Sequence, residues 1–144
     1  MRGRSFYVWG SVVYVVAGAV HASTHFLPPP TDLDVVAAED AMMKAKLSMG
    51  LETTMYSAME CLGWYMTTLS VLVGVVGLSL AGRCRDDAWL MRKLSLLFGL
   101  GAGALAFIAY EFKILPPLVL YAVAAVLFLI AAVRALRQPA GTPV

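Results

Sequence analysis

Four long apolar stretches, separated by short polar clusters, are the feature that most constrains how this chain of 144 residues folds. Each stretch has about 20 or more residues, the length that an α-helix needs to cross a hydrocarbon core of roughly 30 Å. A soluble domain needs charged side chains spread over its surface, whereas here only 14% of the residues are charged and 60% are apolar. The sequence therefore predicts an all-α integral membrane protein, a four-helix transmembrane bundle with helices over about residues 6–27, 56–80, 88–110 and 115–136.

The segments outside these stretches are short, and only the loop after the first stretch is extended. A run of three prolines opens this loop, and Thr31 and Asp34 then have the spacing of a capping box. We expect a short amphipathic helix over residues 32–47, on the membrane surface or on the bundle. Residues 1–137 are expected to form a single transmembrane domain, and residues 138–144, with two prolines and a glycine, a disordered cytoplasmic tail.

The basic residues predict the orientation of the helices. Eight of the 11 lysines and arginines flank one set of helix ends and three lie on the other side, so the positive-inside rule puts both termini in the cytoplasm. These side chains follow the membrane topology and form no basic patch, so we expect no nucleic-acid partner. The eight are Arg2, Arg4, Arg83, Arg85, Arg92, Lys93, Arg134 and Arg137, and the three are Lys44, Lys46 and Lys113.

The two cysteines, Cys61 and Cys84, are expected at opposite ends of the second helix. At about 1.5 Å per residue they would lie roughly 35 Å apart, too far for a disulfide. Neither belongs to a CxxC pair, so the sequence gives little support to thiol redox chemistry.

Small and polar residues recur on one face of each of the first three helices. Their spacing alternates between three and four residues, which makes a continuous stripe on a helix of 3.6 residues per turn. Small residues let helix backbones approach closely, so we expect these faces to meet in the bundle interior. The stripes are Ser11, Tyr14, Gly18, His21 and His25 on the first helix; Tyr56, Glu60, Gly63, Thr67, Ser70, Gly74 and Gly77 on the second; and Ser95, Gly99, Ala102, Ala106 and Ala109 on the third.

Within these stripes, His21, His25 and Glu60 share a depth, because the first two helices run antiparallel and all three residues lie near the expected outer boundary. An ionised carboxylate costs about 2.5–3.5 kcal/mol at the bilayer centre and less near the interface, so such a group is usually paired. Histidine is its natural partner. With Tyr14 and Tyr56 on the same stripes, these residues form the candidate polar or ligand-binding set.

Three interpretations of this set remain open. The first is a hydrogen-bonded pair that fixes the packing of two helices. The second is proton handling, because histidine titrates near neutral pH. The third is a metal site with His21, His25 and Glu60 as ligands. Two histidines one turn apart on one helix cannot be both axial ligands of one haem, and no cofactor is expected.

The methionines raise a related question, because six of the eight lie in the outer loop or the outer half of the second helix. Together with the histidines, their thioethers would suit soft Cu(I). Methionine also fills irregular apolar gaps, and without a tight MxxM array that interpretation is favoured. The six are Met42, Met43, Met49, Met55, Met59 and Met66.

The order of several short motifs resembles a family of small bacterial four-helix membrane proteins of uncharacterised function. These motifs are Gly18 and His21 near the end of the first helix, Met49-Gly50 before the second, Gly63 early in it, and Pro116-Pro117 before the fourth. The resemblance covers most of the chain and implies a multi-pass protein of the plasma (inner) membrane with no established activity. It transfers no catalytic residue, and the acidic segment 32–47 departs from it.

The sequence favours a non-enzymatic accessory subunit or interaction module. It would contact the lipid bilayer and a membrane-protein partner or a second copy of itself. No nucleophile–base set is visible, so no catalytic residue is predicted. One alternative is a small proton- or metal-coupled transporter or binding protein that uses the His/Glu site near the extracytoplasmic face. Another is a membrane enzyme that modifies a lipid or a quinone in a cavity between the helices.

Overall fold

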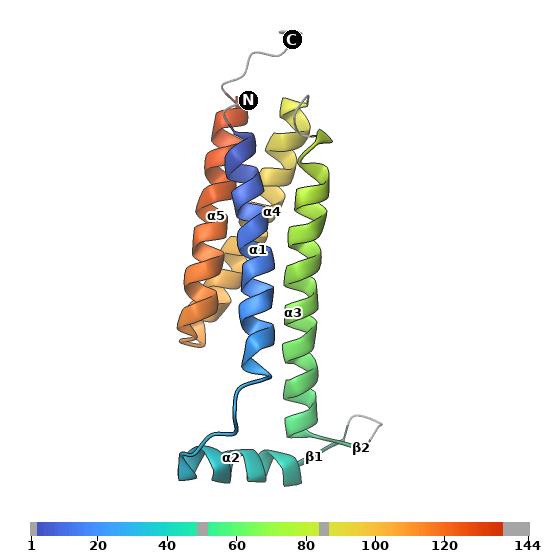
Figure 1. Cartoon of the computed structure of the whole chain (residues 1–144), viewed down its shortest axis with the longest axis vertical. Coiled ribbons are helices and arrows are strands. Elements are labelled where there is room, and N and C mark those ends of the chain that lie inside the picture. Colours follow the sequence, from blue (N-terminus) through green and yellow to red (C-terminus); the bar gives the residue numbers. More distant parts are fainter. Residues whose placement is uncertain (1–2, 49–51, 84–86, 137–144) are drawn as a thin grey trace. The chain divides into compact units, whose positions relative to one another are not determined.

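The computed structural model describes residues 3–48, 52–83 and 87–136, and these contain five helices and two short strands (Figure 1). Four long helices form a bundle, and a short helix lies between the first and the second of them in the chain. The elements in order are α1 (Arg4–Thr24), α2 (Leu33–Lys44), β1 (Lys46–Ser48), β2 (Glu52–Thr54), α3 (Met55–Leu80), α4 (Ala88–Glu111) and α5 (Leu115–Leu136).

The four long helices, α1, α3, α4 and α5, are each long and apolar enough to cross a membrane. They have 21, 26, 24 and 22 residues, and at about 1.5 Å per residue each reaches across a hydrocarbon core. The prediction of four spans is therefore confirmed. The largest difference is at the end of the first span, where the helix stops at Thr24 although the apolar stretch continues to Leu27.

The short helix α2 begins and ends inside the predicted segment 32–47. Its N-cap is Asp32, whose carboxylate accepts from the backbone N–H of Asp34 at 2.9 Å. The prediction that Thr31 caps this helix is therefore wrong by one residue. A carboxylate satisfies an otherwise unpaired N–H at a helix start at least as well as a hydroxyl, which explains the preference for Asp32.

A β-hairpin that the sequence did not predict follows α2. Strands β1 and β2 pair antiparallel, with Lys46 opposite Thr54 and Leu47 opposite Thr53. The backbone N–H of Met55 donates to the carbonyl of Ala45 at 2.9 Å and closes the base of the hairpin. With three residues in each strand, the hairpin is too short for an alternating pattern to reveal it.

The chain divides into two compact units. One comprises Met1–Ala17 and Ser70–Val144, and the other comprises Gly18–Leu69. The boundaries fall inside α1 and inside α3, so each unit contains a part of both helices. That residues 1–137 form a single domain stays a prediction.

The first unit brings together α4, α5 and parts of α1 and α3. Helices α4 and α5 pack side by side (Figure 1). Four aromatic rings, those of Tyr7, Tyr14, Phe98 and Phe128, are in contact in its core. Small residues surround these rings and allow close helix approach. The buried small residues of α4 and α5 are Ser95, Gly99, Ala102, Ala106, Ala109, Ala124, Ala125, Ala131, Ala132 and Ala135.

Basic side chains gather at one end of this first unit. The Arg4 side chain donates from Nε to the carbonyl of Ala81 at 3.1 Å, just beyond the end of α3. The guanidinium of Arg134 lies 4.4 Å from the centre of the Phe6 ring. The start of α1 therefore lies beside the ends of α3 and α5, which is the alternating up-and-down arrangement that short connections favour.

Two sequence predictions concern residues outside the described ranges. The disordered tail over residues 138–144 lies beyond residue 136, and Cys84 lies between residues 83 and 87. The other cysteine, Cys61, is in α3, where its thiol is free and exposed.

Candidate functional site

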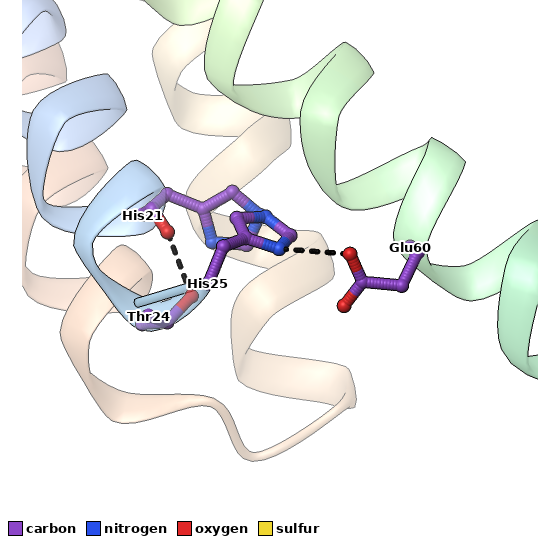
Figure 2. A network of polar contacts seen from close by, with 4 residues as sticks. All are labelled: His21, Thr24, His25 and Glu60. Carbon is purple, nitrogen blue, oxygen red and sulfur yellow. Dashed lines mark hydrogen bonds and ion pairs between the residues drawn. The ribbon is translucent and has the colours of Figure 1, made fainter. Parts of the chain in front are cut away.

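The candidate site is formed within the second unit by the end of α1 and the first half of α3. Helix α1 ends at Thr24, where its last two hydroxyls bond to backbone carbonyls three residues back. Ser23 donates to the carbonyl of Val20 at 2.6 Å, and Thr24 donates to that of His21 at 2.7 Å (Figure 2). Such local bonds compete with helix continuation. The chain then forms a tighter turn, in which the backbone N–H of His25 donates to the carbonyl of Ala22, three residues back, at 3.2 Å.

This ending sets the position of His25, which lies in the turn just after the helix and not on it as predicted. Its imidazole extends toward α3 and meets the carboxylate of Glu60 (Figure 2). His25 Nδ1 and Glu60 Oε2 are 3.2 Å apart. The side chain of His25 is 10% exposed and that of Glu60 is 43% exposed, so the pair lies at the edge of the packed region.

The contact with Glu60 also bears on the protons of the His25 ring. The carboxylate of Glu60 in its ionised form only accepts hydrogen bonds, and with it the Nδ1–H of His25 is the donor. In the neutral ring the Nε2 atom then carries the free lone pair. This is the arrangement in which a carboxylate fixes the tautomer and the orientation of an imidazole that acts through its other nitrogen.

Two residues of α3 next to Glu60 hold the ring of His25 on its remaining sides. The indole of Trp64 stacks on it, with 4.4 Å between ring centres and 13° between planes. At Gly63, a Cβ atom would lie 2.8 Å from Cε1 and 3.0 Å from Nε2 of His25. Only a glycine leaves room for the imidazole there, because real Cβ atoms do not approach so closely.

His21 is one turn earlier, on α1, and its ring lies next to the ring of His25 (Figure 2). The centres of the His21 and His25 rings are 5.7 Å apart, with the ring planes at 80°. The Nε2 atom of His21 lies 3.6 Å from the Cβ position of Gly63, and the Nε2 atom of His25 lies 3.0 Å from it. Both Nε2 atoms therefore lie within 3.6 Å of the same point beside the backbone of α3.

Neither of these Nε2 atoms has a hydrogen-bond partner among the residues that the structure describes, although both are buried. The hydroxyl of Thr67, one helical turn after Gly63, is buried and unpartnered within the same described ranges. Buried polar atoms are nearly always hydrogen-bonded or bound to an ion. Three such atoms along neighbouring turns are the most unusual chemical feature of the second unit.

The two tyrosines of the predicted set are not part of this arrangement. Tyr56 is half-buried one turn before Glu60, and among the described residues no hydrogen bond or ring contact joins it to the histidines. Tyr14 belongs to the first unit, where it is 3% exposed. Its hydroxyl donates to the carbonyl of Phe98 at 3.5 Å, and its ring contacts that of Tyr121.

Trp64 belongs to the cluster formed with His21, His25 and Glu60, and it is the member that the sequence interpretation missed. It reads as an aromatic residue of the membrane interface, as Trp near a helix end usually does. The available signal was its spacing, because Trp64 follows Glu60 by four residues and so projects from the same side of α3. From that position the Trp64 side chain can reach His25, which is the hydrogen-bond partner of Glu60.

The prediction that all three of His21, His25 and Glu60 ligate a metal stays a prediction. Across residues 3–48, 52–83 and 87–136, no group of three or more His, Cys, Asp and Glu side chains is placed to hold a metal ion together. Glu60 contacts Nδ1 of His25, on the other side of the ring from the unpartnered Nε2 atom.

No protein-family model, curated protein or solved structure matches this chain. The resemblance to small bacterial four-helix membrane proteins implied four membrane-spanning helices, and the structure has four candidate spans. The chain is thus a multi-pass membrane protein in contact with the lipid bilayer, and no family is identified.

Proposed function

We propose that this chain is a non-enzymatic membrane protein that binds a small ligand between the imidazoles of His21 and His25. The observation that carries the proposal is a pair of buried Nε2 atoms that have no hydrogen-bond partner among the described residues and lie within 3.6 Å of the Cβ position of Gly63. Glu60 and Trp64 hold the ring of His25 in place from the edge and from the face.

The chemistry of these nitrogens defines what such a ligand offers. A neutral imidazole with its proton on Nδ1 presents a lone pair at Nε2, so the ligand must accept electron pairs or donate hydrogen bonds. A metal cation satisfies the first condition and supplies both nitrogens with a partner at once. The two available nitrogens thus support one of the alternatives given above, a metal-binding protein. Transport and proton coupling stay predictions.

Native mass spectrometry of protein freshly purified in a mild detergent tests this proposal. The wild-type chain should retain a small bound species, and the His21→Phe/His25→Phe variant, which keeps two rings but no nitrogen, should lose it. The matched control is Tyr56→Phe, which changes a polar residue of the same stripe outside the cluster. A bound species that is equally abundant in the wild-type and the double variant would refute the proposal, as would finding none in the wild-type protein.

A second candidate, an accessory subunit, is favoured by the surface of α2. In the described structure no residue of this helix is buried, and several of its apolar side chains are exposed. Leu33 is 82% exposed and Met43 is 48% exposed. An apolar helix surface of this kind suits the membrane interface or a membrane partner.

Proximity labelling from α2 shows whether this helix contacts a protein partner or only the lipid of the membrane interface. With a photoreactive group at Leu33 in native membranes, an accessory subunit should give a discrete protein adduct. The same group at Asp34 serves as the control for the polar side. Adducts to lipid alone would count against the accessory role.

We also propose that the chain lies in a bacterial inner membrane with both termini in the cytoplasm. Support comes from the resemblance described above and from the gathering of Arg4 and Arg134 at one end of the first unit. Reporter fusions test this orientation. An alkaline phosphatase inserted after Lys44 should be active and one fused after Val144 inactive, and the reverse pattern would overturn the proposed topology.

A further inference from the structure

We propose that the ligand of this site is a monovalent, closed-shell metal ion, Cu(I), bound by Nε2 of His21 and Nε2 of His25. This inference rests on the proposed ligand-binding function and names the ligand. It also assigns Glu60 a role different from the one that the sequence suggested, because Glu60 orients a ligand and does not bind the metal itself.

The number of donors is the first reason for this choice. Zn²⁺ in proteins takes four ligands in a tetrahedral arrangement, or three and a water molecule. Within the described ranges, no group of three or more His, Cys, Asp and Glu side chains is suitably placed. Cu(I) accepts two nitrogen ligands on opposite sides, so the imidazole pair is a sufficient donor set.

The charge of the ion is the second reason. His21 lies in the last turn of a helix that can span the membrane and His25 directly after that helix, and both Nε2 atoms are buried. The cost of moving an ion from water to an apolar medium rises with the square of its charge, so a monovalent ion is far less costly there than a divalent one. The nearby carboxylate of Glu60 balances a single positive charge.

The contacts of His25 provide the third reason. A metal-binding histidine usually donates its other N–H to a carboxylate, which fixes the tautomer and increases the basicity of the ligating nitrogen. The 3.2 Å contact between His25 Nδ1 and Glu60 Oε2 is of this kind, and it leaves Nε2 as the ring nitrogen for the ion, 3.0 Å from the Cβ position of Gly63. Trp64 restricts rotation of the same ring by stacking on it.

Gly63 contributes space for the ion. A side chain at this position would crowd both nitrogens, since its Cβ would lie 3.0 Å from Nε2 of His25 and 3.6 Å from Nε2 of His21. The glycine therefore leaves room both for the rings and for an ion near them. The proposal consequently requires a residue without a side chain at position 63.

The test is an anaerobic titration of the purified protein with Cu(I) in competition with a chromogenic Cu(I) chelator. One equivalent should bind to the wild-type protein and none to His21→Gln or to His25→Gln. Because Cys61 is a free, exposed thiol next to Glu60, the titration is repeated on Cys61→Ser/Cys84→Ser, which should bind as the wild type does. Loss of binding in this variant, or its retention in either histidine variant, would overturn the inference.

The role of Glu60 needs a readout that a purely structural role would not affect. Glu60→Leu should weaken Cu(I) binding about 10–100-fold, and Glu60→Gln should recover part of that loss because an amide oxygen still accepts from Nδ1. In the ¹⁵N spectrum of histidine-labelled protein, Cu(I) should shift the Nε2 resonances of both histidines. Equal affinities for Glu60→Leu and the wild type would remove Glu60 from the site.

Failure of this inference can be told apart from failure of the proposed function. If Cu(I) does not bind while native mass spectrometry detects another species that the His21→Phe/His25→Phe variant loses, the ligand is not Cu(I) and the binding function stands. If neither measurement detects a ligand, both proposals are wrong. A Zn²⁺ titration in parallel should show no competition with Cu(I), and displacement of Cu(I) by an equimolar amount of Zn²⁺ would also refute the choice of ion.

Discussion

Gly63 and His25 are in direct contact, since a Cβ atom at residue 63 would lie 2.8 Å from Cε1 of the imidazole. The ring can meet both Glu60 and Trp64 because α3 has no side chain at this point. The orientation of the histidine therefore depends on a residue with which it forms no hydrogen bond.

The substitution Gly63→Ala should displace the His25 ring and break its bond to Glu60, while the helices still form. The expected result is loss of the hydrogen-bonded Nδ1–H signal of His25 in the ¹⁵N spectrum of labelled protein in nanodiscs. Gly103→Ala is the matched control, because within the described residues nothing lies within 4 Å of its Cβ position. An unchanged His25 signal in Gly63→Ala would show that the ring does not depend on this contact.

A second prediction concerns helix packing in the first unit. A Cβ atom at Gly74 would lie 2.6 Å from Cγ2 of Val15 and 2.7 Å from the backbone oxygen of Ser11. The backbone cannot yield as a side-chain tip can, so Gly74→Ala should cost about 1–3 kcal/mol of stability. Thermal unfolding in detergent should show a lower midpoint for this variant.

The variant Gly103→Ala, the control used above, separates the effect of packing on stability from the effect of helix propensity. Alanine is favoured over glycine inside a helix by about 1 kcal/mol, so Gly103→Ala should leave the midpoint unchanged or raise it. Equal decreases in the thermal midpoints of Gly74→Ala and Gly103→Ala would mean that close backbone approach at Gly74 does not cause the loss of stability.

The architecture could be predicted from the sequence because the bilayer fixes both the length and the composition of a spanning helix. Periodicity also identified much of the interior face of α3. Ser70 is buried there, and Gly74 and Gly77 both lie against Ser11. The alternating spacing of three and four residues carries this information directly, since it follows from the geometry of the helix.

The features that could not be predicted depend on local hydrogen bonds and on side-chain orientation. The apolar stretch runs to Leu27, but α1 ends at Thr24, the hydroxyls of Ser23 and Thr24 bond to carbonyls three residues back, and His25 lies in a turn. Hydropathy does not report such bonds. The stacking of Trp64 on His25 was hidden for a similar reason, because an aromatic residue near a helix end is common at any membrane interface.

A third prediction addresses the buried hydrogen bond between α3 and α5. The hydroxyl oxygens of Ser70 and Tyr121 are 2.6 Å apart, and both residues are buried. In a double-mutant cycle of Ser70→Ala and Tyr121→Phe, the coupling free energy should be about 0.6–1.7 kcal/mol, as for other hydrogen bonds between membrane helices. Unfolding of the four proteins in detergent measures it. A coupling near zero would show that the two hydroxyls do not stabilise each other.

A fourth prediction concerns the turn between α4 and α5, where Lys113 has a φ of 56°. This left-handed residue lets two backbone N–H groups reach the last carbonyls of α4. Lys113 donates to Tyr110 at 3.0 Å and Ile114 donates to Ala109 at 2.9 Å, a Schellman ending in which glycine is the usual residue.

An L-residue in this conformation costs about 1–2 kcal/mol, and the extra freedom of glycine in the unfolded chain offsets about 0.5–1 kcal/mol of that. Lys113→Gly should therefore stabilise the protein by up to about 1.5 kcal/mol and raise its thermal midpoint. Lys113→Ala removes the same charge but keeps the unfavourable conformation, so its midpoint should not rise. If both variants raised the midpoint equally, the gain would come from the loss of the lysine charge and not from the backbone.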